Sequence, residues 1–215
     1  MRFPLIIFDC DGVLIDSEPI ANRVLSAELA RAGLRLHPDE VMRRFVGRTR
    51  AGCLELAAAL LGRELPADFA KAWDQALFAA FAEELRPIEG VREAIAAIGA
   101  RTCVASNSSR ERMRVSLQAA GLAPLFGDRV FSAEVVARPK PAPDLFLHAA
   151  ASMGAAPGDC AVVERTRARR RGRDRVPAHE GASRPAQGVT ASDFSASASV
   201  FGRTWMKRAR NRPAS

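Results

Sequence analysis

Two patterns of hydrophobic and polar positions alternate along this chain. Short apolar runs that end at polar residues predict buried β-strands. Between these runs, apolar residues recur at spacings of three and four, which is typical of helices. The runs lie at residues 4–9, 102–105, 129–131 and 160–163. Strands that alternate with helices predict an α/β fold with a parallel, doubly wound, Rossmann-like sheet.

The helical pattern is unbroken by any strand signal from Glu18 to about Glu84. Glycine and proline interrupt it near 33–37, 47–50 and 62–66, so several helices are expected rather than one. This block predicts a helical insertion at residues 18–85. The α/β core is then expected to combine residues 1–17 with residues 86–164.

The pattern changes abruptly after Glu164, where residues 165–175 include seven arginines. The chain carries a net charge of +8, but residues 165–215 hold 13 of its 32 basic and 3 of its 24 acidic residues, a net +10. The other 164 residues are therefore slightly acidic, at −2. We interpret residues 165–215 as an atypical tail, either disordered or produced by a shifted reading frame.

Composition narrows the class of protein further. No stretch approaches the roughly 20 apolar residues that span a membrane, and the short N-terminal apolar run, broken by Asp9, is not typical of a signal peptide. The four cysteines are scattered without a CxxC pair, which favours a reduced, cytoplasmic protein over a disulfide scaffold or a zinc site.

The strongest candidate chemistry follows the first apolar run, in Asp9-Cys10-Asp11-Gly12. In open α/β sheets, ligands bind beyond the carboxyl ends of the strands. Two carboxylates at that edge can hold a cation and divide the work of nucleophile and acid/base. The alternative is a pair of helix N-caps at a strand-to-helix turn.

Polar residues also follow later strands. Ser106 comes after the second run, and its hydroxyl with nearby backbone N–H groups would hold a phosphate oxygen, although such serine clusters are usually turns. Lys140, in Lys-Pro-Ala-Pro-Asp, would offset negative charge at the same edge, although most lysines are simply solvated. Glu164 ends the last run.

These motifs, in this order over about residues 3–164, resemble the haloacid dehalogenase-like (HAD) hydrolase superfamily, and within it the phosphatases and β-phosphoglucomutases with a helical cap. The resemblance implies that Asp9 attacks phosphorus to form an aspartyl-phosphate. Asp11 would protonate the leaving oxygen and then activate water, while Ser106 and Lys140 bind and neutralise the phosphoryl group.

In the helical insertion, the loop Val46-Gly47-Arg48-Thr49-Arg50 looks like the substrate-facing loop of the family's cap. We therefore expect Gly47, Arg48 and Arg50 to bind substrate together with Asn107. The alternative for the two arginines is an ordinary exposed position.

The chain departs from the family at the fourth motif. The family has a pair of acidic residues there that helps to bind Mg²⁺, whereas this chain has Glu164 followed by Arg165. We expect Mg²⁺ at Asp9, Asp11 and Glu164, with Arg165 opposing the ion.

The resulting hypothesis is a Mg²⁺-dependent hydrolase of phosphate monoesters, acting on a small phosphorylated metabolite such as a sugar phosphate or phosphoglycolate, with activity impaired by the missing acid. A phosphomutase is the near alternative. A nucleic-acid or acidic-surface binding arm at residues 165–215 is the other alternative, but no binding module accompanies the arginines, so we favour a flexible extension over a nucleic-acid partner. The sequence carries no signal for oligomeric state.

Overall fold

The computed structural model describes residues 3–46 and 48–164. The predictions for Gly47, for Arg165 and for the rest of residues 165–215 lie outside these ranges. The elements in chain order are β1 (Leu5–Phe8), α1 (Glu18–Arg31), α2 (Pro38–Phe45), α3 (Arg50–Leu61), α4 (Phe69–Glu84), α5 (Val91–Ile98), β2 (Arg101–Ser106), α6 (Arg110–Ala119), α7 (Ala123–Phe126), β3 (Val130–Ser132), the 3₁₀ turn Ala133–Val135, α8 (Asp144–Ser152), the 3₁₀ turn Pro157–Asp159 and β4 (Cys160–Val163).

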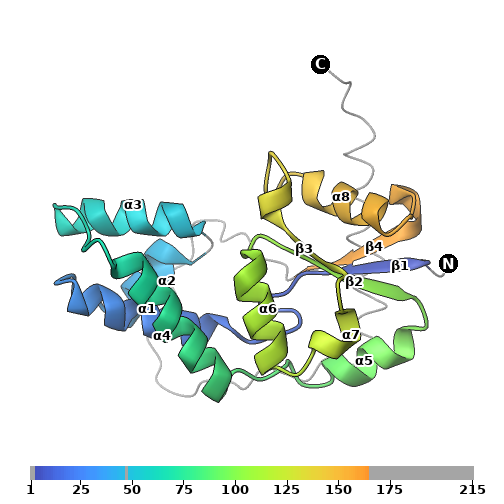
Figure 1. The fold of residues 1–215 in the computed structure, drawn as a ribbon, viewed down its shortest axis with the longest axis horizontal. Coiled ribbons are helices and arrows are strands. Elements are labelled where there is room, and N and C mark those ends of the chain that lie inside the picture. The colour runs from blue at the N-terminus through green and yellow to red at the C-terminus, as the bar shows by residue number, and fades with distance from the viewer. Residues whose placement is uncertain (1–2, 47, 165–215) are drawn as a thin grey trace, which may run out of the picture.

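The described strands form one parallel sheet in the order β3-β2-β1-β4. Ile7 of β1 lies opposite Cys103 of β2 on one side and Val162 of β4 on the other. Helix α8 covers one face of this sheet, and α5, α6 and α7 lie on the opposite side (Figure 1). The parallel α/β fold expected from the sequence is therefore confirmed.

Coverage of both faces explains why the strands are continuously apolar. All four residues of β1 are buried, and alternate ones pack on opposite sides. Leu5 and Ile7 join the cluster beneath α8, whereas Ile6 and Phe8 join the larger core that includes Phe126 of α7. A strand buried on both faces has no solvent-facing positions to alternate with, so its sequence reads as an unbroken apolar run.

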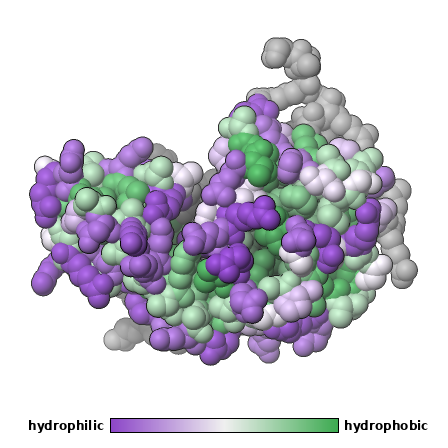
Figure 2. Space-filling model, viewed as in Figure 1, coloured by the Kyte–Doolittle hydropathy of each residue, from purple (hydrophilic) through white to green (hydrophobic). Residues whose placement is uncertain are grey.

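Helices α1 to α4, here called the helical unit, lie to one side of the sheet (Figure 1). Helix α4 buries Phe69, Trp73, Leu77 and Phe81, which recur every four residues and so face the same side of the helix. Hydrophilic side chains cover much of the unit's visible surface (Figure 2). None of the helices in the part of the chain that the structure describes is long and apolar enough to cross a membrane.

Two chain connections join the helical unit to the core, and they run side by side. Ile15 on the outgoing connection forms an antiparallel bridge with Pro87 on the returning one. The Ile88 N–H also donates to the Leu14 carbonyl at 3.0 Å. Leu14 and Ile15 are fully buried, so this crossing point is anchored in the core.

Candidate active site

A lysine and two carboxylates converge at the carboxyl ends of the strands. Asp9 directly follows β1 and Glu164 follows β4, while Lys140 reaches this edge from the loop before α8. Lys140 Nζ lies 3.0 Å from Asp9 Oδ1 and 3.1 Å from Glu164 Oε1. It also stands 4.7 Å from the centre of the Phe146 ring. The lysine is thus held at the site by two opposite charges and an aromatic face.

The Asp9 carboxylate is partly buried and accepts a hydrogen bond from its own loop. The Cys10 N–H donates to Asp9 Oδ1 at 2.8 Å. Burial raises the pKa of Asp9, and the charge and hydrogen bond of Lys140 partly offset this rise. A partly desolvated carboxylate with fixed orientation can act as a nucleophile, and the adjacent ammonium group favours its ionised form.

Asn107 fixes the backbone of Lys140. Its side-chain amide donates to the Lys140 carbonyl at 3.0 Å, and its amide oxygen accepts from the Lys140 N–H at 2.9 Å. Both polar ends of the Asn107 side chain therefore contact the loop that carries Lys140. Substrate binding by Asn107, expected from its place in the sequence, stays a prediction.

Ser106 ends β2 and is buried. Its hydroxyl oxygen accepts a hydrogen bond from the Ser108 N–H at 3.2 Å, which stabilises the turn that leads into α6. The residue therefore stands at the strand end where the sequence places it, and its hydroxyl takes part in the local turn.

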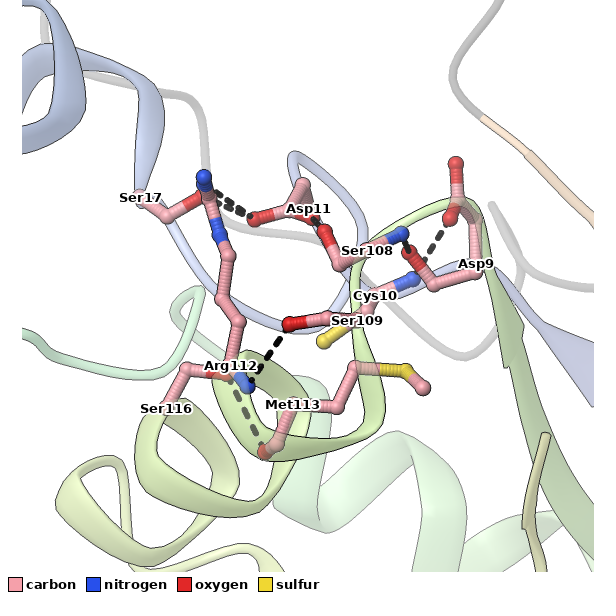
Figure 3. A network of polar contacts seen from close by, with 10 residues as sticks. Asp9, Cys10, Asp11, Ser17, Ser108, Ser109, Arg112, Met113 and Ser116 are labelled. Atoms are coloured by element: carbon pink, nitrogen blue, oxygen red, sulfur yellow. Dashed lines mark hydrogen bonds and ion pairs between the residues drawn. The ribbon is translucent and has the colours of Figure 1, made fainter. Parts of the chain in front are cut away.

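Asp11 is surrounded by donors. Its carboxylate accepts from the hydroxyls of Ser17 and Ser108, the latter at 2.7 Å, and lies 3.4 Å from Nη2 of Arg112 (Figure 3). Burial by itself would raise the pKa of Asp11, but the Arg112 charge and the serine hydrogen bonds outweigh burial and lower it. The side chain is directed toward these donors.

The three carboxylates predicted to bind metal are therefore divided between two settings. Asp9 and Glu164 share Lys140, whereas the Asp11 carboxylate engages Ser17, Ser108 and Arg112. Within residues 3–46 and 48–164, no group of three or more His, Cys, Asp or Glu side chains is arranged to hold a metal ion.

Ser17, Ser108 and Arg112 were not identified from the sequence. Ser108 belongs to a serine cluster whose local pattern indicates only a turn, and Arg112 looks like any polar residue of a helix. Of the three, only Ser17 stands at a position with a local sequence signal. It precedes the proline-containing first turn of α1, where a serine is expected to cap the helix. In the structure the Ser17 side chain does not cap α1. It is fully buried, and its hydroxyl donates a hydrogen bond to Asp11 instead.

The two arginines of the predicted substrate loop contact their own helical unit. Arg50 forms two bonds to the Asp74 carboxylate, at 3.2 and 2.5 Å, and donates to the Ala70 carbonyl at 3.0 Å. Arg48 donates to the Arg44 carbonyl at 2.6 Å. A role for these arginines in substrate binding stays a prediction, and Gly47 between α2 and α3 is outside the described residues.

A parallel α/β sheet with carboxylates at its carboxyl edge and a helical unit inserted after the first strand is the arrangement expected of a haloacid dehalogenase-like hydrolase with a helical cap. A family model described as haloacid dehalogenase-like hydrolase matches residues 3–164. The chain therefore belongs to the haloacid dehalogenase-like hydrolases, as its motifs had suggested.

Relatives and solved structures agree with this assignment. The chain is 34% identical to 6-phosphogluconate phosphatase of Escherichia coli over 164 residues, covering 76% of this chain and 74% of the relative. It is 32% identical to phosphoglycolate phosphatase of Caulobacter vibrioides, covering 72% and 66%. A HAD family hydrolase of Deinococcus radiodurans, solved with bound phosphate and sodium, is 34% identical with a TM-score of 0.59, covering 75% of this chain and 72% of that one.

Proposed function

We propose that this hydrolase cleaves phosphate monoesters of small metabolites, with Asp9 as the nucleophile. The observation that carries the proposal is the position of Lys140 Nζ, 3.0 Å from the Asp9 carboxylate at the carboxyl end of β1. A carboxylate nucleophile beside a fixed cation suits attack on a phosphoryl group, because negative charge must be neutralised as the two approach.

The reaction proceeds in two displacements. An Asp9 oxygen attacks phosphorus, and the bond from phosphorus to the ester oxygen breaks. Asp11, whose pKa the negative charge of the bound phosphate raises so that it takes up a proton, donates that proton to the departing alcohol. Water then attacks the aspartyl-phosphate, Asp11 takes a proton from that water, and inorganic phosphate leaves with Asp9 restored. Lys140 offsets negative charge in both steps, and Asn107 keeps Lys140 in place.

The residues at this edge fit Mg²⁺ in ligand type. Magnesium is usually held by one or two carboxylates together with water and substrate phosphate oxygens, rather than by a full protein cage. Asp9 and Glu164, which already share one cation in Lys140, are the residues that would hold it. When bound, the ion would supply further neutralisation of phosphoryl charge.

The substrate class is suggested by the relatives. Four relatives at 30–34% identity are named 6-phosphogluconate phosphatase, phosphoglycolate phosphatase, hexitol phosphatase and fructose-1-phosphate phosphatase. A fifth, at 30% identity, is named a bifunctional riboflavin kinase/FMN phosphatase, and this chain covers 42% of its length. Phosphates of sugars or sugar derivatives and phosphoglycolate therefore predominate among these names. We therefore propose a sugar phosphate or a phosphoglycolate-type acid as substrate, selected by the helical unit acting as a cap over the site.

The test is a screen of phosphorylated sugars, sugar acids and phosphoglycolate with the full chain, measuring free phosphate with Mg²⁺ and after chelation. We expect phosphate release with Mg²⁺, and a loss of at least about a thousandfold in kcat in Asp9→Asn. Asp16→Asn, the same chemical change at an exposed position nearby, should keep wild-type activity.

Three results would contradict the proposal. Silence of the folded protein across the screen would reject phosphatase activity, and equal activity in Asp9→Asn would reject the nucleophile. Conversion of a sugar phosphate into its isomer without free phosphate would instead identify a phosphomutase.

A further inference from the structure

Arg112 contacts two parts of the molecule that lie far apart in the sequence. It lies in the first turn of α6, where its N–H donates to the N-cap Ser109 at 3.2 Å. Its Nη2 is 3.4 Å from Asp11 Oδ1 in the core. Its guanidinium carbon lies 5.5 Å from the centre of the Phe81 ring on α4 of the helical unit.

These contacts differ from those of a solvated surface arginine. The Arg112 side chain is 27% exposed, and Phe81 is fully buried. Arg112 Nε is buried without a hydrogen-bond partner among the described residues, which costs stability that other contacts must offset. The carboxylate of Asp11 at one end and the aromatic face of Phe81 are contacts that can do so.

The helical unit reaches Asp11 from both of its ends. Ser17, immediately before α1, donates to the same oxygen, Asp11 Oδ1, that Arg112 approaches. Phe81, close to the end of α4, packs on Arg112. A displacement of the unit relative to the core would therefore act on both donors to this one oxygen.

We propose that Arg112 is a positioning residue that ties the orientation of the Asp11 carboxylate to the position of helix α4. This inference rests on the proposed function, because orientation of Asp11 matters only if that carboxyl transfers protons. Arg112 does not touch the reacting atoms; it acts through Asp11. Its contact with Phe81 makes the acid/base group depend on the placement of the helical unit.

Leaving-group chemistry gives a readout that a merely structural arginine would not change. An alkoxide leaves poorly and needs a proton from a well-placed acid, whereas 4-nitrophenolate leaves readily without one. Misplacing the acid should therefore slow alkyl esters far more than aryl esters. A uniform loss on both would indicate general damage.

The experiment compares kcat of the full chain for glycerol phosphate and for 4-nitrophenyl phosphate. We expect Arg112→Ala to lower kcat at least about tenfold more on the alkyl ester than on the aryl ester, with KM little changed, since a small misplacement of a reacting group can cost a hundredfold in rate. Arg112→Lys, which keeps the charge but not the planar fork, should recover part of the loss. Arg114→Ala, an exposed arginine on the same helix, should behave as wild type. Equal losses on both esters, or a higher kcat in Arg112→Ala, would overturn the proposal.

Double mutants test the link of Arg112 to Asp11 and its link to Phe81. In an Asp11→Asn background, Arg112→Ala should cause no further loss in single-turnover cleavage of glycerol phosphate, because the carboxyl that Arg112 orients is no longer there. Phe81→Leu should reproduce the selective loss on the alkyl ester, and adding Arg112→Ala should not deepen it. Fully additive losses in either pair would show that Arg112 acts independently of that partner.

Stability separates failure of this inference from failure of the proposed function. If the wild-type chain cleaves neither these two esters nor any ester of the substrate screen, the phosphatase proposal fails and so does any part of Arg112 in catalysis. Urea unfolding then tests whether Arg112 and Phe81 stabilise the fold through their contact with each other. Less-than-additive midpoint shifts for Phe81→Leu and Arg112→Ala would support it, and additive shifts would reject it.

Discussion

Asn107 shows how one side chain can determine the place of another. Its amide matches the backbone N–H and C=O of Lys140, so it fixes the start of the Lys140 side chain without touching the charged end. The ammonium group then needs little reorganisation to remain between Asp9 and Glu164. Preorganised charge of this kind is usually the largest contribution to stabilising a transition state.

We expect Asn107→Ala to lower kcat at least about tenfold, with KM for the phosphate ester changed much less, because it frees the Lys140 backbone rather than removing a substrate contact. Steady-state kinetics would measure this. Asn22→Ala, on α1, is the matched control. A rise in KM at constant kcat would instead support the substrate-binding role that the sequence predicts for Asn107.

Cys103 provides a prediction about alkaline stability. Burial, with a smaller contribution from Cys160, raises the pKa of its thiol from 9.0 to about 12. The folded state therefore retains a proton that the unfolded state releases, so the stabilisation is complete below pH 9 and is lost as pH rises toward 12.

Between pH 9 and 11, we expect the free energy of unfolding to fall more steeply in wild type than in Cys103→Ala, by about 1.4 kcal/mol per pH unit at most. Urea unfolding at several pH values would measure the two slopes. Parallel slopes would show that the Cys103 thiol does not titrate with unfolding in this range.

At the scale of elements, sequence patterns located most of the fold. The apolar runs at 102–105 and 160–163 correspond to β2 and β4, and the predicted breaks near 33–37, 47–50 and 62–66 separate α1 to α4. These succeed because burial of a strand or of one helix face leaves a local period in the sequence. Helix α7 was missed, since four residues are too few to show one.

The contacts within the site were harder to predict from the sequence than the helices and strands, for a related reason. The position of Asp9 after a buried strand is a local feature and could be predicted. The contacts of Arg112 with Asp11 and of Asn107 with Lys140 join residues 101 and 33 positions apart. Such pairings depend on tertiary packing, so no local pattern marks them.

Arg50 and Asp74 join α3 to α4. This pair is about half exposed, so we expect Arg50→Ala and Asp74→Ala each to lower stability by only about 0.5–1 kcal/mol. Because both variants remove the same ion pair between α3 and α4, we expect them to change kcat and KM equally and little. A KM that rises about tenfold in Arg50→Ala but not in Asp74→Ala would instead indicate a substrate contact for Arg50. Unfolding and kinetic measurements on the same preparations would decide between the two.

At the scale of the whole molecule, charge and family resemblance divide the chain at the same place. The family model ends its match at residue 164, and the excess of positive charge begins at Arg165. The sequence from Arg165 onward follows neither the family pattern nor the charge balance of the residues before it.

We expect the coding DNA to explain this division. If residues 165–215 come from a shifted reading frame, a single-base correction near the codon of Glu164 should restore a second acidic residue followed by a Ser- and Gly-rich stretch. Sequencing the gene and translating all three frames would test the frame-shift hypothesis. A frame in which no such correction exists would reject the hypothesis and favour a native basic extension.

The paired crossing of the chain at Ile15 and Pro87 has a consequence for how such proteins diversify. Because the helical unit leaves and rejoins the core at adjacent points, a different insert could be joined there without changing the order or register of the strands. Recombination at this junction would exchange the helices proposed to select substrates and leave Asp9 unchanged, and a working graft would have to keep an aromatic contact for Arg112 like that of Phe81. The junction thus makes the insert a replaceable module, and a graft from a relative with a known substrate would be a direct route to a new specificity.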